Sequence, residues 1–260
     1  MMFALFPSRK VALEIFGFSV HWYGLLYLLG FLLAFYLLPR LQRYRGLHLS
    51  SDEWSHILSA AIVGVLVGGR LGYVFFYAPE LLKTPLEVLK VWHGGMSSHG
   101  GFIGVALALW WSLRKKNMPL LAIADTAVVP VAIGLALGRL GNFINVELYG
   151  TVTDVPWAMA IPGVEGLRHP LQFYGMAKDL FIASVCFVHL RRTSIPGKTF
   201  GLFLMVYGVL RFLLEYLRQQ YYAPLLLGSL EISRGQLLTV PLFLLGLLLW
   251  VYVSKKRFSV

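Results

Sequence analysis

Apolar residues gather along the chain in long stretches that short polar segments separate. A helix needs about 20 mostly apolar residues to cross the hydrocarbon core of a bilayer. Seven stretches reach or approach this length, and they cover residues 20–38, 54–76, 97–113, 121–141, 171–190, 199–217 and 236–254. The third is the weakest, because it is short and begins with several glycines. The pattern therefore predicts an all-α integral membrane protein with seven transmembrane helices.

The composition of the chain agrees with this class. Of its 260 residues, 58% are hydrophobic and only 13% are charged, whereas about 25% of the residues in soluble domains are charged. A chain of this length cannot hide so much apolar surface in a water-soluble core. The single cysteine makes no intramolecular disulfide bond, which excludes a disulfide-stapled secreted fold.

Twelve of the 23 basic residues lie in four short clusters, each of which directly follows an apolar stretch. The clusters are Arg40/Arg43/Arg45, Arg114/Lys115/Lys116, Arg191/Arg192/Lys198 and Lys255/Lys256/Arg257. Cytoplasmic loops of membrane proteins carry an excess of lysine and arginine. The clusters therefore predict a C-terminus in the cytoplasm and, with seven spans, an N-terminus outside. Much of the net charge of +11 is then explained by residues that set the orientation of the chain in the membrane. Nucleic acid is therefore not an expected partner.

The loops on the opposite, outer side are longer and contain most of the prolines outside the apolar stretches. They cover residues 77–96, 142–170 and 218–235. The longest, 142–170, is expected to form a small external cap on a single transmembrane domain that spans residues 1–260. No useful repeat relates the two halves of the chain, which disfavours a transporter built from inverted repeats.

Three arginines fall inside or at the end of predicted spans, where an ionisable side chain is expensive and points to function. Arg70, Arg139 and Arg211 are all expected toward the outer leaflet. Guanidinium is a planar group with several donors suited to phosphate, so an outer cavity lined by arginine predicts a phospholipid ligand. The alternative is structural: the arginines reach the interface or pair with Glu147 and Glu215.

Helical spacing places further polar residues beside two of these arginines. Residues three or four positions apart are neighbours on a helix surface. One face of the span 199–217 therefore carries Tyr207, Arg211 and Glu215, with Arg218 just beyond. By the same spacing, Asn142 lies on the face of Arg139 if the helix continues that far.

A second group of candidates surrounds His99, which lies between the pairs Gly94-Gly95 and Gly100-Gly101. Such glycines let the backbone turn tightly and approach a ligand, and histidine exchanges a proton near neutral pH. His99 is therefore a candidate base, with a structural histidine as the alternative. His93 and His99 have no cysteine or aspartate partners nearby, so no metal site is expected.

Eight motifs follow one another along the chain. The first four are His21-Trp22-Tyr23-Gly24, Gly68-Gly69-Arg70-Leu71-Gly72-Tyr73, Gly94-Gly95-Met96-Ser97-Ser98-His99-Gly100-Gly101 and Gly138-Arg139-Leu140-Gly141-Asn142-Phe143-Ile144-Asn145. The others are Glu147-Leu148-Tyr149-Gly150, His169-Pro170-Leu171-Gln172-Phe173-Tyr174, Tyr207-Gly208-Val209-Leu210-Arg211 with Glu215 and Arg218, and Ser233-Arg234-Gly235-Gln236. In this order the set resembles the bacterial prolipoprotein diacylglyceryl transferases, and the resemblance covers nearly the whole chain.

The resemblance implies a multi-pass enzyme of the bacterial inner (cytoplasmic) membrane, with its active site toward the periplasm and the loop 142–170 as a periplasmic cap. It implies that the diacylglyceryl group of phosphatidylglycerol is transferred to the lipobox cysteine thiol of preprolipoproteins. A thioether forms and glycerol phosphate leaves, which is the first step of lipoprotein maturation. The implied partners are phosphatidylglycerol, signal peptides with a lipobox cysteine, and membrane lipids. No metal or organic cofactor is expected.

The resemblance also implies roles for the candidate residues. Arg139 and Arg211 are expected to bind the phosphate and stabilise its charge, and His99 to act as a base or to orient the lipid. The predicted catalytic residues are His99, Arg139, Arg211 and Tyr23. The predicted substrate-binding residues are Arg70, Arg139, Asn142, Glu147, Gly150, Tyr207 and Glu215. Of these, Tyr207 and Glu215 are expected to orient Arg211.

At several positions the chain departs from the pattern it resembles. Gly175 stands where a carboxylate is usual, and Leu171 replaces a small hydroxyl residue. Val146 stands where glycine is common, and Thr151 stands where a basic residue is common. These departures motivate one alternative, a non-catalytic phospholipid-binding or lipid-moving membrane protein with the same cavity.

Overall fold

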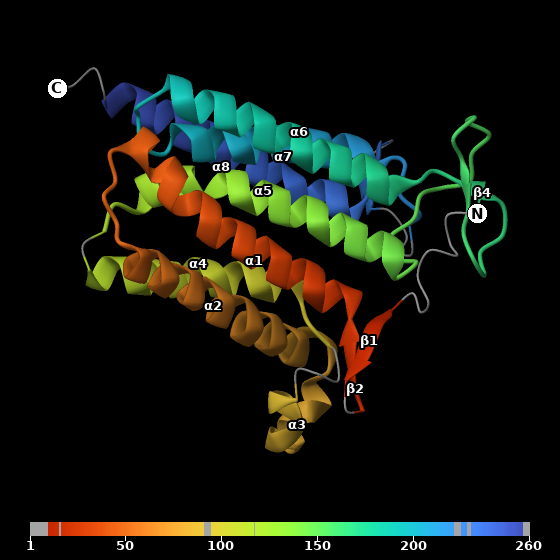
Figure 1. The fold of residues 1–260 in the computed structure, drawn as a ribbon. Helices are drawn as coiled ribbons and strands as arrows, with labels where there is room; N and C mark the ends of the chain where they lie inside the picture. Colours follow the sequence, from red (N-terminus) through yellow and green to blue (C-terminus); the bar gives the residue numbers. More distant parts are fainter. Residues whose placement is uncertain are drawn as a thin grey trace. The chain divides into compact units, whose positions relative to one another are not determined.

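The structure is a computed structural model that describes residues 10–15, 17–90, 95–116, 118–220, 225–227 and 230–256. It is mostly helical, and a helix covers most of each of the seven predicted stretches (Figure 1). These helices are α1 (Trp22–Leu41), α2 (Ser51–Tyr77), α4 (Ser98–Lys115), α5 (Leu120–Ile144), α6 (Leu171–Arg192), α7 (Lys198–Glu215) and α8 (Arg234–Lys256). The prediction of a predominantly helical chain is confirmed.

Five helical segments in the described part are long and apolar enough to cross a membrane, which makes the chain a multi-pass membrane protein. They are Trp22–Arg45, Ser51–Tyr77, Leu120–Ile144, Leu171–Arg192 and Gly235–Lys255. The apolar part of α4, Gly100–Arg114, is shorter. Helix α7 carries Lys198, Arg211 and Glu215 within its 18 residues. The crossing of the membrane by α4 and α7 therefore stays a prediction.

Short elements connect the helices. The 3-10 helix η2 (Gln42–Arg45) extends α1, while η3 (Pro79–Lys83) and the short helix α3 (Pro85–Leu89) follow α2. Among the described residues, antiparallel strand pairs join β1 (Val11–Ile15) with β2 (Phe18–His21), β3 (Met159–Ala160) with β4 (Leu167–Arg168), and β5 (Leu225–Leu227) with β6 (Leu230–Ile232). The hairpin β3–β4 gives the loop 142–170 an ordered structure.

The chain forms two compact units, which are described separately. The smaller unit covers residues 46–123 and contains α2, η3, α3, α4 and the first residues of α5. The larger unit combines residues 1–45 with 124–260. In the larger unit α7 packs against both α6 and α8 (Figure 1).

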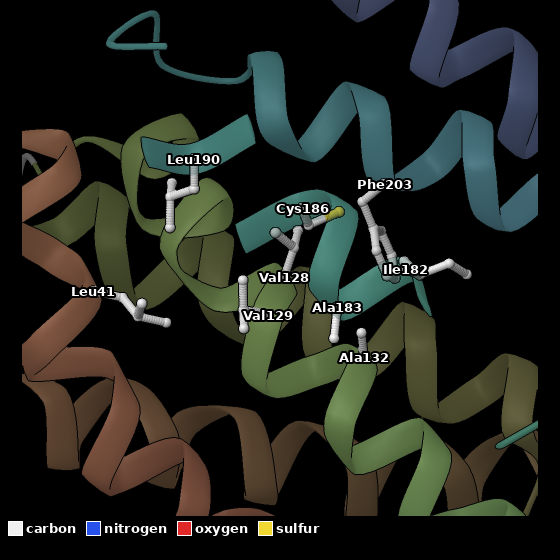
Figure 2. Packing of buried hydrophobic residues seen from close by; sticks show 9 residues of the cluster. All are labelled: Leu41, Val128, Val129, Ala132, Ile182, Ala183, Cys186, Leu190 and Phe203. Carbon is white, nitrogen blue, oxygen red and sulfur yellow. The ribbon is translucent and has the colours of Figure 1, made fainter. Parts of the chain in front are cut away.

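The core of the larger unit is an apolar cluster contributed by α1, α5, α6 and α7 (Figure 2). Its buried members are Leu41, Val128, Val129, Ala132, Ile182, Ala183, Cys186, Leu190 and Phe203. Ala132 on α5 and Ala183 on α6 contribute small side chains to this cluster. Cys186 is fully buried in this cluster, so its thiol acts as a small apolar group there.

The outer faces of the apolar helices are not covered by the rest of the larger unit. Only 11% of the most apolar part of the segment Trp22–Arg45 is buried, and only 17% in Gly235–Lys255. Large apolar side chains such as Leu32 and Leu248 are more than half exposed. Apolar surface of this extent marks a contact with lipid or another protein, as expected for helices in a bilayer.

In the smaller unit, α2 and α4 meet along a seam of glycines. Gly64, Gly68 and Gly72 recur every four residues on α2 and face Gly100 and Gly104 on α4. A Cβ atom added at Gly68 would lie 2.7 Å from the Cα atom of Gly104. Small residues at such spacing let two helix backbones pack closely in a membrane protein. The glycines at positions 68, 72 and 100 therefore serve helix packing rather than the tight turn predicted for Gly100.

Replacing Gly68 by alanine is expected to lower the free energy of unfolding by about 1–3 kcal/mol, because the added methyl group overpacks the seam. The matched control is Gly134→Ala in α5, where an added Cβ atom would have no neighbour within 4 Å. Denaturant unfolding of the two variants in detergent micelles measures the difference. A Gly68→Ala protein as stable as the Gly134→Ala protein would show that the seam tolerates a side chain.

Candidate functional site

A small cavity in the larger unit is lined by four basic side chains. Arg139 comes from α5, Lys178 from α6, Arg211 from α7 and Arg218 from the segment that follows α7. The remaining lining residues are Leu148, Leu171, Gly175 and Leu214. The structure therefore brings together Arg139 and Arg211, the two arginines predicted to bind phosphate, and adds two further cations.

Two buried carboxylates pair with these four cations. Glu215, which is 3% exposed, forms an ion pair with Arg211 and lies 3.6 Å from Arg218, measured from Oε2 to Nη1. Asp179, which is 1% exposed, pairs with Lys178 and lies 3.9 Å from Arg139, measured from Oδ2 to Nε. Four cations against two carboxylates leave an excess of two positive charges among the paired groups. Such a site favours an anion.

The electrostatics of Arg218 show how closely the cations are gathered. Burial lowers the pKa of its guanidinium group, and Glu215 opposes this effect. Arg211 and Arg139 lower the pKa of Arg218 further, because like charges repel. A bound anion between these side chains would relieve the repulsion.

Helix α7 presents its polar residues as the spacing predicts. Arg211 and Glu215 are one turn apart and form an ion pair, so they share a face. Glu215 is held in place from two further sides. The amide of Gln220 donates to its Oε1 over 3.3 Å, and a Cβ atom added at Gly235 would lie 2.6 Å from its Cδ. Glu215 thus anchors both arginines of this part of the site, and its own substitution would free them.

Tyr207 lies between two of the cations. The Nζ atom of Lys178 stands 4.1 Å from the centre of the Tyr207 ring, and Arg139 lies within reach of the Tyr207 hydroxyl group. An aromatic face attracts a cation. Tyr207 therefore contacts Lys178 and Arg139, and Arg211 is near enough to affect it electrostatically. Its predicted role in orienting Arg211 stays a prediction.

The loop after α5 is closed by hydrogen bonds around Glu147. The side chain of Asn142 donates to Oε1 of Glu147 over 2.8 Å, and the Glu147 backbone N–H donates to the carbonyl of Asn142 over 3.0 Å. Gln172 of α6 donates to the Glu147 carbonyl over 2.8 Å. The next residue, Leu148, lines the cavity. The predicted substrate-binding residues Asn142 and Glu147 are therefore in contact with each other at the edge of the site.

This loop contains backbone strain. Val146 has φ +59° and Leu148 has φ +55°, and both angles lie in the left-handed region that glycine adopts most easily. For a β-branched valine this conformation is an outlier. The structure thus gives a physical reason why glycine would suit position 146.

Val146→Gly is expected to raise the free energy of unfolding. A left-handed residue with a side chain costs about 1–2 kcal/mol, and the added backbone freedom of glycine offsets roughly 0.5–1 kcal/mol of the gain. The net stabilisation is then about 1 kcal/mol or less, measured by denaturant unfolding in micelles. The control is Val152→Gly, at an exposed residue whose φ is not positive, which is expected to bring no gain.

Gly150 ties the same loop to the segment after α7. It forms an antiparallel bridge with Arg218, and its N–H donates to the carbonyl of His169 over 3.1 Å. A Cβ atom added at Gly150 would lie 2.6 Å from the Cβ of His169 and 2.9 Å from the carbonyl oxygen of Leu217. No residue with a side chain fits there without a shift of the backbone, so Gly150 positions Arg218 through its backbone.

Tyr23 lies in the first turn of α1 and packs on α5. A Cβ atom added at Gly141 would lie 2.8 Å from Cε2 of the Tyr23 ring. The hydroxyl group of Tyr23 is 3.4 Å from that of Tyr27. Glu147 and Arg139 are near enough to affect the Tyr23 hydroxyl group electrostatically. The structure thus places Tyr23 beside the predicted site residues of α5.

Arg70 and His99 belong to the smaller unit. Arg70 is 6% exposed and donates to the backbone carbonyls of Glu87, Val88 and Gly95 over 2.6, 2.8 and 3.2 Å. These bonds hold α3 and the following loop to α2. His99 lies in the first turn of α4, and its side chain, like the whole of His93, lies outside the described residues.

Two of the four basic residues that line the cavity were not among the predicted site residues. One of them is Lys178, which lies beside Asp179 in α6. Its signal was an ionisable side chain in the middle of an otherwise apolar stretch. Arg218 was noted on the face of Arg211 but not assigned to the site.

The departure at Gly175 also has a structural consequence. A Cβ atom added at Gly175 would lie 2.9 Å from Cδ of Arg139, so the Arg139 side chain occupies the space beside this glycine. The carboxylate that faces Arg139 in this chain is Asp179, one helical turn further along α6.

Comparison with known proteins identifies relatives that match most of the chain. The family model described as prolipoprotein diacylglyceryl transferase matches residues 10–252. Proteins named phosphatidylglycerol–prolipoprotein diacylglyceryl transferase are similar over nearly their full length. That of Polynucleobacter asymbioticus is 43% identical, with 93% of each chain covered. That of Geobacter sulfurreducens is 43% identical over 91% of this chain and 92% of its own, and that of Vibrio cholerae is 43% identical over 92% and 89%.

Proposed function

The chain belongs to the prolipoprotein diacylglyceryl transferase family, and we propose that it transfers the diacylglyceryl group of phosphatidylglycerol to a prolipoprotein. In this proposal the phosphate of the lipid binds in the cavity of Arg139 and Arg211. The observation that carries the assignment of the site is the excess of two positive charges in this cavity. The acceptor is the thiol of a lipobox cysteine, as the resemblance implies. The product is a thioether.

The proposed reaction develops negative charge on the phosphate group, which faces the cationic side chains of the cavity. The thiolate attacks the glyceryl carbon that carries the phosphate, an S–C bond forms, and the C–O bond to the phosphate breaks. The electron pair of the broken bond stays on the phosphate oxygen. A phosphodiester with one negative charge thus becomes a phosphate monoester, whose second ionisation has a pKa near 6. Guanidinium groups that face the phosphate stabilise this developing charge.

The remaining predicted residues support this centre. Glu215 and Tyr207 orient the cationic side chains, as their contacts with Arg211, Arg139 and Lys178 indicate. Asn142, Glu147 and Gly150 hold the loop that contributes Leu148 to the cavity. We assign contact with the lipid to Tyr23, and we keep His99 as the candidate base for the thiol. Arg70 is proposed to contribute to lipid binding through the loop that it holds.

The proposed enzyme lies in the bacterial inner membrane as one domain of seven spans. Its N-terminus and its site face the periplasm, the segment 142–170 caps the site, and the C-terminus is cytoplasmic. Support comes from the distribution of charge along the helices. Arg139, Arg211 and Arg218 lie near or after the C-terminal ends of α5 and α7. The basic clusters of residues 40–45 and 191–198 lie together at the other end of the same bundle.

The test is transfer of a labelled diacylglyceryl group from phosphatidylglycerol vesicles to a lipobox peptide by the purified protein. We expect a labelled thioether product and free glycerol phosphate in equal amounts. A peptide with serine in place of the lipobox cysteine is the control and should give no product. Binding of phosphatidylglycerol without any thioether would favour the alternative of a non-catalytic lipid-binding protein.

A further inference from the structure

Lys178 is a cation of the cavity to which the proposed chemistry assigns no role. It is 7% exposed, in the middle of a helix that is otherwise mostly apolar there. Its ammonium group pairs with Oδ1 of Asp179 and lies over the ring of Tyr207. Burial of a lysine is costly unless its charge is compensated, so its presence in the cavity calls for a reason.

The position of Asp179 supplies that reason. Its Oδ2 atom has no hydrogen-bond partner among the described residues and lies 3.9 Å from Nε of Arg139. A close ion pair with a carboxylate would use the donors of Arg139 that a phosphate needs. Because Lys178 holds the other carboxylate oxygen, Asp179 stays at this longer distance from Arg139.

We propose that Lys178 is a positioning residue of the phosphate site, which holds Asp179 and thereby keeps the Arg139 guanidinium group available to the phosphate. The inference rests on the proposed function for the identity of the anion. Lys178 also sets the balance of charge. With Lys178 present, the paired groups of the cavity carry an excess of two positive charges.

The excess of two positive charges matches the charge of the leaving group better than the charge of the substrate. The phosphate of phosphatidylglycerol carries one negative charge, whereas the departing glycerol phosphate carries about two at neutral pH. An active site accelerates a reaction by binding the transition state more tightly than the ground state. Without Lys178 the excess would fall to one, which still matches the substrate but not the leaving group, and Asp179 would be free to pair with Arg139.

The test begins with Lys178→Met, which keeps the length of the side chain and removes its charge. We expect kcat to fall by about 10²-fold, the effect of losing one electrostatic stabiliser of the transition state, while KM for phosphatidylglycerol changes little. Inhibition by glycerol phosphate, which is a dianion, is expected to weaken by about tenfold or more. Lys178→Arg keeps the charge and should retain most of the activity.

The double variant Lys178→Met/Asp179→Asn separates this role from a structural one. It removes both partners, so the excess of two positive charges returns and Arg139 has no competing carboxylate. We expect kcat and the affinity for glycerol phosphate to recover most of the loss. In the single variant Asp179→Asn the excess rises to three, so inhibition by glycerol phosphate should become stronger than in the unchanged protein. A role in packing alone predicts neither effect.

The controls keep this inference distinct from the proposed function. If the unchanged protein forms no thioether, the proposed function fails. If the unchanged protein forms the thioether and Lys178→Met has the same kcat as the unchanged protein, the inference about Lys178 is wrong. It is also wrong if the folded double variant recovers neither kcat nor glycerol phosphate binding. The folded fraction of each variant is measured by size-exclusion chromatography in detergent, and glycerol phosphate binding by titration calorimetry, which reports on the site without turnover.

Discussion

Replacing Arg139 by alanine is expected to lower the rate of diacylglyceryl transfer by about 10²–10³-fold, the usual effect of removing one group that stabilises the charge of a transition state. Arg139 lines the cavity together with Arg211 and Arg218. Its side chain is 26% exposed, so its guanidinium group is not enclosed by protein. The variant is compared with the unchanged protein by the yield of labelled thioether per unit time.

The geometry of Arg139 allows a sharper comparison. Arg139→Lys keeps the positive charge but loses the planar fork that can bind two phosphate oxygens at once, so we expect an intermediate rate. Arg192→Ala is the matched control, because Arg192 is an exposed arginine at the other end of the helix bundle, on α6. A normal rate in the Arg139→Ala protein would overturn the assignment of phosphate binding to this residue.

The helices of the chain could be predicted from the sequence because their signal is local. Each apolar stretch is long, and the end of a helix follows from residues within a turn or two. Helix α2, for example, begins with a capping box in which Ser50 and Glu53 exchange hydrogen bonds. The hairpins were not predicted, since strands of two to five residues contain too few positions to show a pattern.

Residue spacing predicts direct contacts within the site only where the residues share one helix. The face of Tyr207, Arg211 and Glu215 follows from a spacing of four residues, and the structure confirms the pair of Arg211 with Glu215. The meeting of Arg139 with Lys178 depends instead on how α5 packs against α6, which no local pattern encodes. The same holds for Arg70, whose donors are taken by backbone carbonyls of a loop about 20 residues away.

The role of the glycines around His99 could not be predicted from the sequence, because it depends on what packs against each of them. A glycine allows both a tight turn and the close approach of another backbone, and the sequence alone does not distinguish them. Gly95 has φ +74° and is a case of the first kind. Gly100 lies within α4 against Gly72 of α2 and is a case of the second.

Arg45 illustrates how a residue can belong to a charge pattern and have a different role in the structure. The sequence groups it with Arg40 and Arg43 as a determinant of topology. In the structure it is buried, and its guanidinium group donates to Asp125 over 2.6 Å, to Thr199 over 2.6 Å and to the carbonyl of Thr193 over 2.6 Å. It thereby joins the start of α5 to the connection between α6 and α7.

Asp125 completes this buried cluster from the other side. It is fully buried, and besides Arg45 it accepts hydrogen bonds from the backbone N–H groups of Gly197 and Phe200 over 2.8 and 2.6 Å. All three contacts reach residues far along the chain, so the cluster ties η2, α5 and α7 together at one end of the bundle. Its loss should therefore affect the whole larger unit.

Arg45→Met is expected to lower the free energy of unfolding by about 3–5 kcal/mol, because it leaves the charge of Asp125 buried without its partner. Arg43→Met is the matched control: Arg43 is an exposed residue of the same 3-10 helix and of the same basic cluster, so its loss has the same effect on the charge pattern. The double variant Arg45→Met/Asp125→Asn removes both charges and should recover part of the stability. Denaturant unfolding in micelles measures all three proteins. If Arg45→Met and Arg43→Met are equally stable, Arg45 acts only through topology, and the buried pair contributes nothing to holding the helices together.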